Sequence, residues 1–135
     1  MTDGEFAIET RHVDPVNLMD PEVRPPRQRV WIKAQKSVGD DPVLNQCLLA
    51  YATDMTLLTT SARPHRLSGL KGDQLASLDH AIWFHAPIDM GDWLLYDQDS
   101  PWSGGARGFN RGSIYRRDGL LLASVAQEGV IRPKR

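Results

Sequence analysis

The sequence predicts an α+β protein in which an antiparallel β-sheet wraps around one long central helix. Residues 42–62 contain a single charge, Asp54, and they carry apolar residues at helical spacing. Four predicted strands follow this helix in series, with turn residues between them. A helix with so little charge must be covered by other elements, so we expect the strands to form a sheet around it.

The N-terminal part is predicted to hold two strands and a loop. Phe6 and Ile8 alternate with polar residues, which predicts a strand over residues 6–13. Residues 14–27 include four prolines and are expected to form a loop, because proline lacks the N–H group that regular structure needs. A second strand is predicted over residues 29–35.

The central helix has recognisable ends. Asp41 is a suitable N-cap, and Pro42 fits the first helical position. The Arg63-Pro64 pair is expected to end the helix, since the residue before a proline disfavours helical geometry. The residues expected on its buried face share helical spacing: Leu44, Leu48, Tyr51, Met55 and Leu58.

The C-terminal half is predicted to consist of strands. They are expected at about residues 74–86, 92–100, 105–116 and 120–131. The Asp118-Gly119 pair indicates a tight hairpin turn between the last two. Consecutive strands joined in this way usually pair with each other, which predicts antiparallel order.

Two polar residues interrupt apolar patterns. Asp54 has no cationic residue one turn away, so a position beside the buried face would desolvate its carboxylate and make it a candidate general base. The alternative is an Asp at the solvent edge of the helix, or one bonded to the backbone. Gln127 falls on the apolar face of the last strand, where a buried amide needs hydrogen-bond partners, for structure or for function.

Several motifs in collinear order resemble the C-terminal half of type II acyl-CoA thioesterases. They include Leu49-Ala-Tyr-Ala-Thr-Asp54, Ser77-Leu-Asp-His-Ala-Ile-Trp-Phe-His85 and Ala123-Ser-Val-Ala-Gln-Glu-Gly-Val-Ile131. The resemblance is dense from about Arg29 to Arg132. Members of that family carry two tandem hotdog domains. The resemblance therefore implies that residues 1–135 form one hotdog domain, equivalent to the second of the two.

The resemblance also implies a hydrolytic site. In the family, an Asp on the helix, a Gln on the last strand and a hydroxyl residue before an Asp-His pair hold and activate water. These correspond to Asp54, Gln127 and Ser77. The family usually has Thr in place of Ser77, so the hydroxyl is kept but the β-branch that stiffens the rotamer is lost. The implied reaction is hydrolysis of acyl-CoA to free fatty acid and coenzyme A, with no cofactor or metal.

Strand alternation raises a question about the residues around the Asp-His pair. It places Ser77 on the face opposite to the apolar residues of its strand. Either a bulge turns this side chain round, or Ser77 acts through its backbone. His80 and His85 are five residues apart and point to opposite faces, so we expect structural roles for both and no metal site.

Substrate-binding candidates are weaker. Arg107 and Gly108 belong to a glycine-rich stretch where a pantetheine arm could run along the sheet, and sheet curvature is the alternative explanation for the glycines. Basic residues gather in this half of the chain, and we favour a solvated surface over a coenzyme A phosphate site: Arg107, Arg111, Arg116, Arg117, Arg132, Lys134 and Arg135.

Composition narrows the partners and the compartment. The net charge of −1 gives no global attraction to nucleic acid or acidic membranes, and no apolar stretch is long enough to span a bilayer. The single cysteine, Cys47, is expected in the core and fits a reducing compartment such as the cytoplasm. No signal peptide is recognisable, and the C-terminal Arg-Pro-Lys-Arg differs from the peroxisomal Ser-Lys-Leu.

Acyl-CoA hydrolysis is the leading hypothesis for the function. The alternatives are a non-catalytic hotdog half that serves assembly or acyl binding, and a hotdog hydratase that acts on enoyl thioesters. A lone hotdog domain would leave an unpaired sheet edge, and Trp83, Trp93 and Trp102 add aromatic surface. We therefore expect a homodimer, or pairing with another hotdog domain, with acyl-CoA as the substrate.

Overall fold

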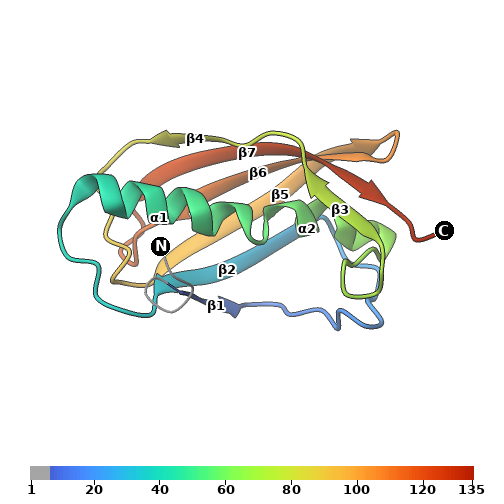
Figure 1. Cartoon of the computed structure of the whole chain (residues 1–135), viewed down its shortest axis with the longest axis horizontal. Coiled ribbons are helices and arrows are strands. Elements are labelled where there is room, and N and C mark those ends of the chain that lie inside the picture. Colours follow the sequence, from blue (N-terminus) through green and yellow to red (C-terminus); the bar gives the residue numbers. More distant parts are fainter. Residues whose placement is uncertain (1–6) are drawn as a thin grey trace.

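The computed structural model describes residues 7–135 of the chain. A seven-stranded antiparallel sheet curls around a helical segment that runs along its concave side (Figure 1). The strand order is β1-β2-β5-β6-β7-β3, and β4 also pairs with β7. The predicted fold class, an antiparallel sheet wrapped around a central helix, is confirmed.

The strands follow the sequence prediction, but one predicted strand is divided and the one expected over about residues 92–100 extends to Gly104. Their bounds are β1 (Ile8–His12), β2 (Arg27–Ala34), β3 (Gln74–Ser77), β4 (Ala81–Phe84), β5 (Leu94–Gly104), β6 (Arg107–Tyr115) and β7 (Leu121–Arg132). The strand predicted over residues 74–86 is divided into β3 and β4. Phe6, which was included in the first predicted strand, lies outside the described residues.

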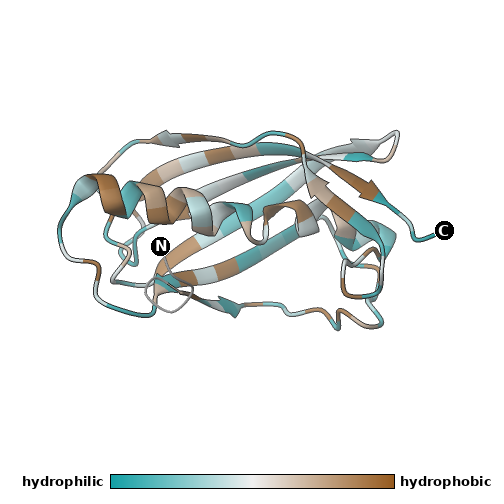
Figure 2. Cartoon of the chain, in the orientation of Figure 1, coloured by the Kyte–Doolittle hydropathy of each residue, from teal (hydrophilic) through white to brown (hydrophobic). Residues whose placement is uncertain are grey.

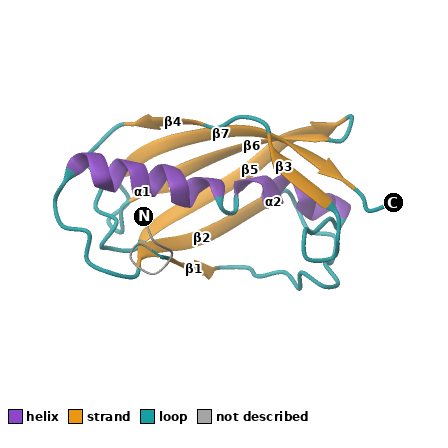
Figure 3. Cartoon of the chain, in the orientation of Figure 1, coloured by secondary structure: helices purple, strands orange, loops and turns teal. Residues whose placement is uncertain are grey.

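The central helix begins as predicted but is interrupted. The carboxylate of Asp41 caps α1 (Pro42–Asp54) by accepting from the backbone N–H of Val43 at 3.0 Å. Two residues that are not part of either α-helix follow α1, and the chain resumes as α2 (Leu57–Ala62) and a 3₁₀ turn, η1 (Arg63–His65) (Figure 3). One continuous helix over residues 42–62 was therefore a wrong prediction.

Side chains from the sheet satisfy the polar groups at this interruption. Gln98 donates to the hydroxyl of Thr56 at 2.9 Å, and Gln28 donates to the carbonyl oxygen of Thr56 at 3.0 Å. These bonds offer Thr56 partners that compete with helical hydrogen bonding. The two glutamines belong to a buried group that we call the glutamine–threonine cluster: Gln28, Gln98, Thr56, Thr59 and Thr60.

The buried face of α1 differs from the predicted one. Its buried residues are Asn45, Leu48, Leu49, Ala52 and Thr53. Tyr51 and Met55, which were expected on that face, are 54% and 47% exposed, and Cys47 is exposed as well. The expectation that Cys47 lies in the core is wrong, because apolar residues occur on both sides of α1, as the brown residues along its visible side show (Figure 2).

The core lies between the buried face of α1 and the concave side of the sheet. Alternate residues of β2, β5 and β7 point inward, among them Val30, Leu94, Tyr96 and Val125. The phenol of Tyr96 donates to the carbonyl oxygen of Thr53 at 3.0 Å, at the C-terminal end of α1. The core therefore holds the end of this helix in a fixed position against β5.

Two glycines let α2 lie directly on the sheet. A Cβ atom at Gly108 would collide with the side chain of Ser61, and one at Gly129 would collide with Leu58. Both glycines lie on neighbouring strands and pair with each other. Glycine is needed at both positions because α2 packs closely on the sheet. Neither explanation offered for Gly108 from the sequence, a pantetheine arm or sheet curvature, included this role.

A β-bulge separates β3 from β4. Ser77 pairs with Gly129 and Ala81 pairs with Ala126, so four residue steps on this side face three steps on β7. The N–H groups of Leu78 and Asp79 both point to one acceptor, the carbonyl oxygen of Glu128, at 2.9 and 3.4 Å. The extra residue reverses the alternation of side chains between the two strands.

Candidate active site

Asp54 occupies the C-terminal end of α1, where its side chain is 50% exposed. The expectation of a desolvated carboxylate beside the buried face is therefore wrong, and the alternative, a position at the solvent edge, is correct. The end of a helix carries partial negative charge on its free carbonyl groups, which disfavours a carboxylate. Asp54 thus occupies a position where its charge does not stabilise the helix.

Ser77 contacts this carboxylate from the end of β3. Its hydroxyl donates to Oδ1 of Asp54 at 3.0 Å. The bulge between β3 and β4 turns Ser77 to the concave side of the sheet, which decides between the two placements left open by the sequence. The hydroxyl itself, and not only the backbone, faces the helix.

Gln127 completes the predicted trio from β7. Its side chain is 1% exposed, as the alternation on that strand predicted. Its Nε2 donates to Oγ of Ser77 at 2.7 Å. The structure therefore brings Asp54, Ser77 and Gln127 together, in one line from the buried strand to the half-exposed end of the helix.

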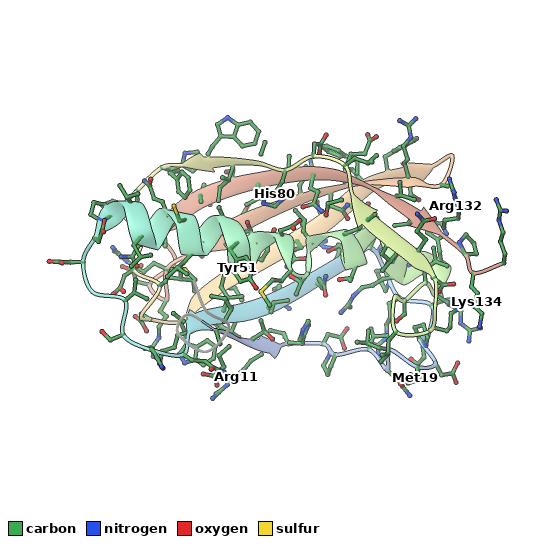
Figure 4. All side chains as sticks on the ribbon, in the orientation of Figure 1. Arg11, Met19, Tyr51, His80, Arg132 and Lys134 are labelled. Atoms are coloured by element: carbon green, nitrogen blue, oxygen red, sulfur yellow. The ribbon has the colours of Figure 1, made fainter. Side chains whose placement is uncertain are left out.

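His80 extends the same line and was not predicted as part of the site. Its Nδ1 bonds to Oε1 of Gln127 and lies 3.8 Å from Oδ1 of Asp54. Its Nε2 lies 2.9 Å from the hydroxyl of Thr53 on α1. Figure 4 shows His80 between α1 and β7. The only sign of this in the sequence was the proximity of the Asp-His pair to Ser77, because the bulge that turns His80 inward cannot be read from residue types.

Tyr96 supports the end of the helix beneath Asp54. Burial raises the pKa of its phenol well above the ordinary value, and the negative charge of Asp54 raises it further. The phenol therefore stays protonated and keeps its hydrogen bond to Thr53, the residue next to Asp54. Asp54 is held through the backbone by a neutral donor.

A cavity of about 490 Å³ opens beside Asp54 and Ser77. Apolar side chains from α2, β3 and the neighbouring loops form much of its wall: Val16, Leu18, Met55, Leu58, Leu67, Leu70 and Leu75. His12 and Arg63 also line it, and burial together with the charge of Arg63 lowers the pKa of His12. His12 is therefore neutral at pH 7. The cavity offers an apolar space that begins at the carboxylate.

The weaker candidates lie elsewhere. Arg107 is more than half exposed and pairs with Glu128 at 3.2 Å, and Gly108 faces Ser61 of α2. Neither lines the cavity beside Asp54. Four arginines of the basic group have carboxylate partners, namely Arg107, Arg111, Arg116 and Arg117. These pairs favour the solvated-surface interpretation of the group.

His85 and the metal-binding residue types bear on two further expectations from the sequence, within the described part of the chain. His85 directly follows β4 and bonds to the hydroxyl of Ser124 at 2.9 Å, on the face opposite to His80, as predicted. Across residues 7–135, no group of three or more His, Cys, Asp or Glu side chains is arranged to hold a metal ion. In the same part of the chain, no helix has the length and apolar character needed to cross a membrane.

The sheet wrapped around a helix is the architecture of hotdog-fold proteins. A putative thioesterase from Syntrophus aciditrophicus shares this fold, with a TM-score of 0.71 at 12% identity over 92% of this chain and 84% of that chain. Residues 2–130 match the family described as acyl-CoA thioesterase, and the chain belongs to that family. The resemblance seen in the sequence motifs is confirmed.

Individual relatives agree with this assignment. Acyl-coenzyme A thioesterase 8 of Mus musculus is 42% identical over 131 residues, 96% of this chain and 41% of that protein. Acyl-CoA thioesterase 2 of Haemophilus influenzae is 37% identical over 94% of this chain and 44% of that protein. The structure of acyl-CoA thioesterase II TesB2 from Mycobacterium marinum has a TM-score of 0.78 at 40% identity, over 94% of this chain and 49% of that chain. The chain spans less than half the length of these relatives.

Proposed function

We propose that this chain carries the hydrolytic site of an acyl-CoA thioesterase, in which Asp54 activates the attacking water. One observation carries the proposal: the hydroxyl of Ser77 lies between the Asp54 carboxylate and the Gln127 amide, at the edge of an apolar cavity. Membership of the acyl-CoA thioesterase family supports the substrate class.

The reaction needs a base, a held water and an exit for the thiol. Asp54 is exposed enough to contact water, and its carboxylate can take a proton from a water molecule held beside it. Ser77, whose oxygen accepts from Nε2 of Gln127, holds the water beside the carboxylate. The water oxygen bonds to the thioester carbonyl carbon, the C–S bond breaks, and the proton taken by Asp54 passes to the departing coenzyme A sulfur.

The cavity beside Asp54 is the proposed site of the acyl chain. Leu58, Leu67 and Leu75 line this cavity from α2, the following loop and β3, and such side chains suit a fatty acyl chain. Asp54 also lines the cavity, and the thioester carbonyl would stand beside its carboxylate. The coenzyme A part would then remain outside the cavity. No metal or cofactor enters the proposed chemistry.

We also propose that residues 1–135 form one hotdog domain that pairs with a second, as a homodimer or with another hotdog domain. The outer side of α1 supports this, because Val43 and Tyr51 are more than half exposed there. Trp83 is 54% exposed on β4, which among residues 7–135 pairs with β7 alone. The net charge and the single cysteine fit a cytoplasmic setting without nucleic-acid or membrane partners.

One observation gives the hydratase alternative some support. His80 lies 3.8 Å from the carboxylate of Asp54, and enoyl-thioester hydration generally uses such a pair. Both ring nitrogens of His80 are engaged, however, one by Gln127 and the other by Thr53. An imidazole held in this way has no free nitrogen for a substrate, so hydrolysis is the better proposal.

The test is release of free coenzyme A thiol by the purified chain from acyl-CoAs of several lengths. Hydrolysis that saturates with substrate is expected, and crotonyl-CoA should be hydrolysed or left alone but not hydrated. Sedimentation at micromolar concentration should give a mass near twice 15.1 kDa. A dimer without hydrolysis would support the non-catalytic alternative, and hydration of crotonyl-CoA would support the hydratase.

A further inference from the structure

We propose that His80 is a positioning residue that fixes the orientation of the Gln127 side-chain amide. This inference rests on the proposed function, because it assigns a role within the same site. His80 is 20% exposed and contacts the amide directly, whereas it reaches Asp54 only at 3.8 Å. It would act on the reaction through Gln127 and Ser77.

The orientation of the amide follows from counting hydrogens. Ser77 has one hydroxyl hydrogen, and its oxygen lies 3.0 Å from Asp54 and 2.7 Å from the amide of Gln127. An ionised carboxylate can only accept, so the hydroxyl hydrogen must point to Asp54. Gln127 must then present an N–H to the Ser77 oxygen. With the amide turned the other way, two acceptors would compete for one hydrogen.

The same count fixes the proton on His80. Once Nε2 of Gln127 faces Ser77, its Oε1 faces Nδ1 of His80. An amide oxygen has no hydrogen to give, so Nδ1 must carry one. Every donor in the line then points the same way, from His80 to Gln127, from Gln127 to Ser77 and from Ser77 to Asp54. The carboxylate receives the last hydrogen bond.

The imidazole is itself held at its other end. Its Nε2 lies 2.9 Å from the hydroxyl of Thr53, a fully buried residue next to Asp54 on α1. The bulge after Ser77 places His80 directly before β4 and across from Gln127 on β7. The ring therefore bridges the helix and the sheet, and it has no freedom to turn away from the amide.

Removing the Nδ1–H would leave the amide free to flip. A flipped Gln127 would place its oxygen against Ser77 and draw the hydroxyl hydrogen away from Asp54. Only a part of the molecules would then hold the water correctly. Turnover should fall while substrate binding stays the same, because the cavity does not include His80 or Gln127 in its lining.

Two substitutions separate the Nδ1 contact from the Nε2 contact. In His80→Asn, the side-chain nitrogen stands close to the former Nδ1 and can still donate to Gln127. In His80→Gln, the nitrogen reaches the former Nε2 position and contacts Thr53 instead. We expect His80→Gln to lower kcat about 10-fold or more, by the usual worth of such a bond, with KM within twofold. His80→Asn should recover most of that loss.

The controls separate positioning from folding. His85→Ala removes a histidine that follows β4 and bonds to Ser124, and this variant should hydrolyse acyl-CoA like the wild type. In a Gln127→Ala background, His80→Gln should cause no further loss, because His80 acts through that amide. Losses that multiply in the double variant, or a His80→Asn variant as slow as His80→Gln, would overturn the proposal.

A spectroscopic measurement does not depend on activity. The ¹⁵N shifts of the His80 ring in the wild-type protein at pH 8 should show a protonated Nδ1. An unprotonated Nδ1 would overturn the inference, whatever the enzyme assays give. Absence of any wild-type acyl-CoA hydrolysis would contradict the proposed function, and the ring shifts would still decide the orientation of the amide.

Discussion

Gln98 and Gln127 are both 1% exposed, but they belong to polar groups with different ends. Gln98 accepts from Thr60 at 2.8 Å and donates to Thr56 at 2.9 Å, so its bonds stay within the buried glutamine–threonine cluster. Gln127 donates to Ser77, whose hydroxyl ends on a half-exposed carboxylate beside a cavity. The two amides are equally buried, but only Gln127 connects to a carboxylate, whereas the cluster of Gln98 connects through Gln28 to the guanidinium of Arg63.

The difference shows what distinguishes buried polar residues that serve stability from those that serve the reaction in this protein. Each cluster satisfies its buried amide, as folding requires. Only the second connects its amide, that of Gln127, through a hydroxyl to a group that can exchange a proton, the Asp54 carboxylate. The glutamine–threonine cluster should therefore be important for stability, and the line ending at Asp54 should be important for turnover. The predictions below test this separation, beginning with the largest effect.

Asp54→Asn should have the largest effect, because it removes the base while keeping the volume. Thioesterase activity is expected to fall on the order of 10²–10⁴-fold, the usual worth of a positioned base. The free energy of unfolding should hold or rise slightly, since a carboxylate at a helix C-terminus opposes the helix dipole. Activity and denaturant unfolding measured together check this, and near wild-type turnover would end the assignment of Asp54.

Gln127→Ala should have the second-largest effect on activity, and Gln98→Ala is the variant with which it is compared. The first variant is expected to lose about 5–150-fold in kcat, equivalent to about 1–3 kcal/mol for a lost partner in a buried network. Gln98→Ala should instead lower the free energy of unfolding by about 1–3 kcal/mol, with turnover per folded molecule largely kept. Equal loss of turnover in both variants would contradict the comparison.

Ser77→Ala should do less harm than Gln127→Ala. We expect a loss of about fivefold, the worth of one ordinary hydrogen bond, because water can replace a hydroxyl at an exposed position. Ser77→Thr should be tolerated, since it restores the family residue and keeps the hydroxyl. Steady-state kinetics of the two variants provide the measurement. Inactive Ser77→Thr beside active Ser77→Ala would show that the hydroxyl is not used.

The smallest expected effect is that of replacing Asp73, whose carboxylate should influence stability and not turnover. The backbone N–H groups of Lys134 and Ser68 hold its pKa below the ordinary value, together with Lys71. Its contribution is complete above the unfolded value near pH 4 and is lost as the pH falls through the lower folded value. Asp73→Asn should therefore flatten the acid side of the Tm profile below about pH 4. An unchanged profile would contradict this.

Local signals in the sequence predicted most helices and strands well. The site was predicted only in part, because it depends on contacts between residues far apart in the chain. The Asp41 cap and the Asp118-Gly119 hairpin follow from bonds between near neighbours, and the structure has both. The phase of α1 was wrong because apolar residues extend around most of the helix, so periodicity could not decide which side meets the sheet. Cys47 was misplaced for this reason.

The site depended on pairings that residue types do not reveal. Asp54 was selected because a buried carboxylate was expected, but it is half exposed, and the family resemblance supported it more soundly. Gln98 alternates with apolar residues on β5 just as Gln127 does on β7, so pattern alone could not separate them. His80 was expected to be structural because its spacing of five from His85 points the two to opposite faces, and its contact with Gln127, 47 positions away in the chain, leaves no local signal.

The bulge at Leu78 and Asp79 makes this site sensitive to chain length as well as to residue type. Ser77 and His80 both face the helix only because one extra residue stands between their strands. Deletion of a single residue there would leave every other side chain unchanged, yet one of the two would turn to the outer surface. In this segment, a loss of one codon is a more severe lesion than most amino-acid replacements.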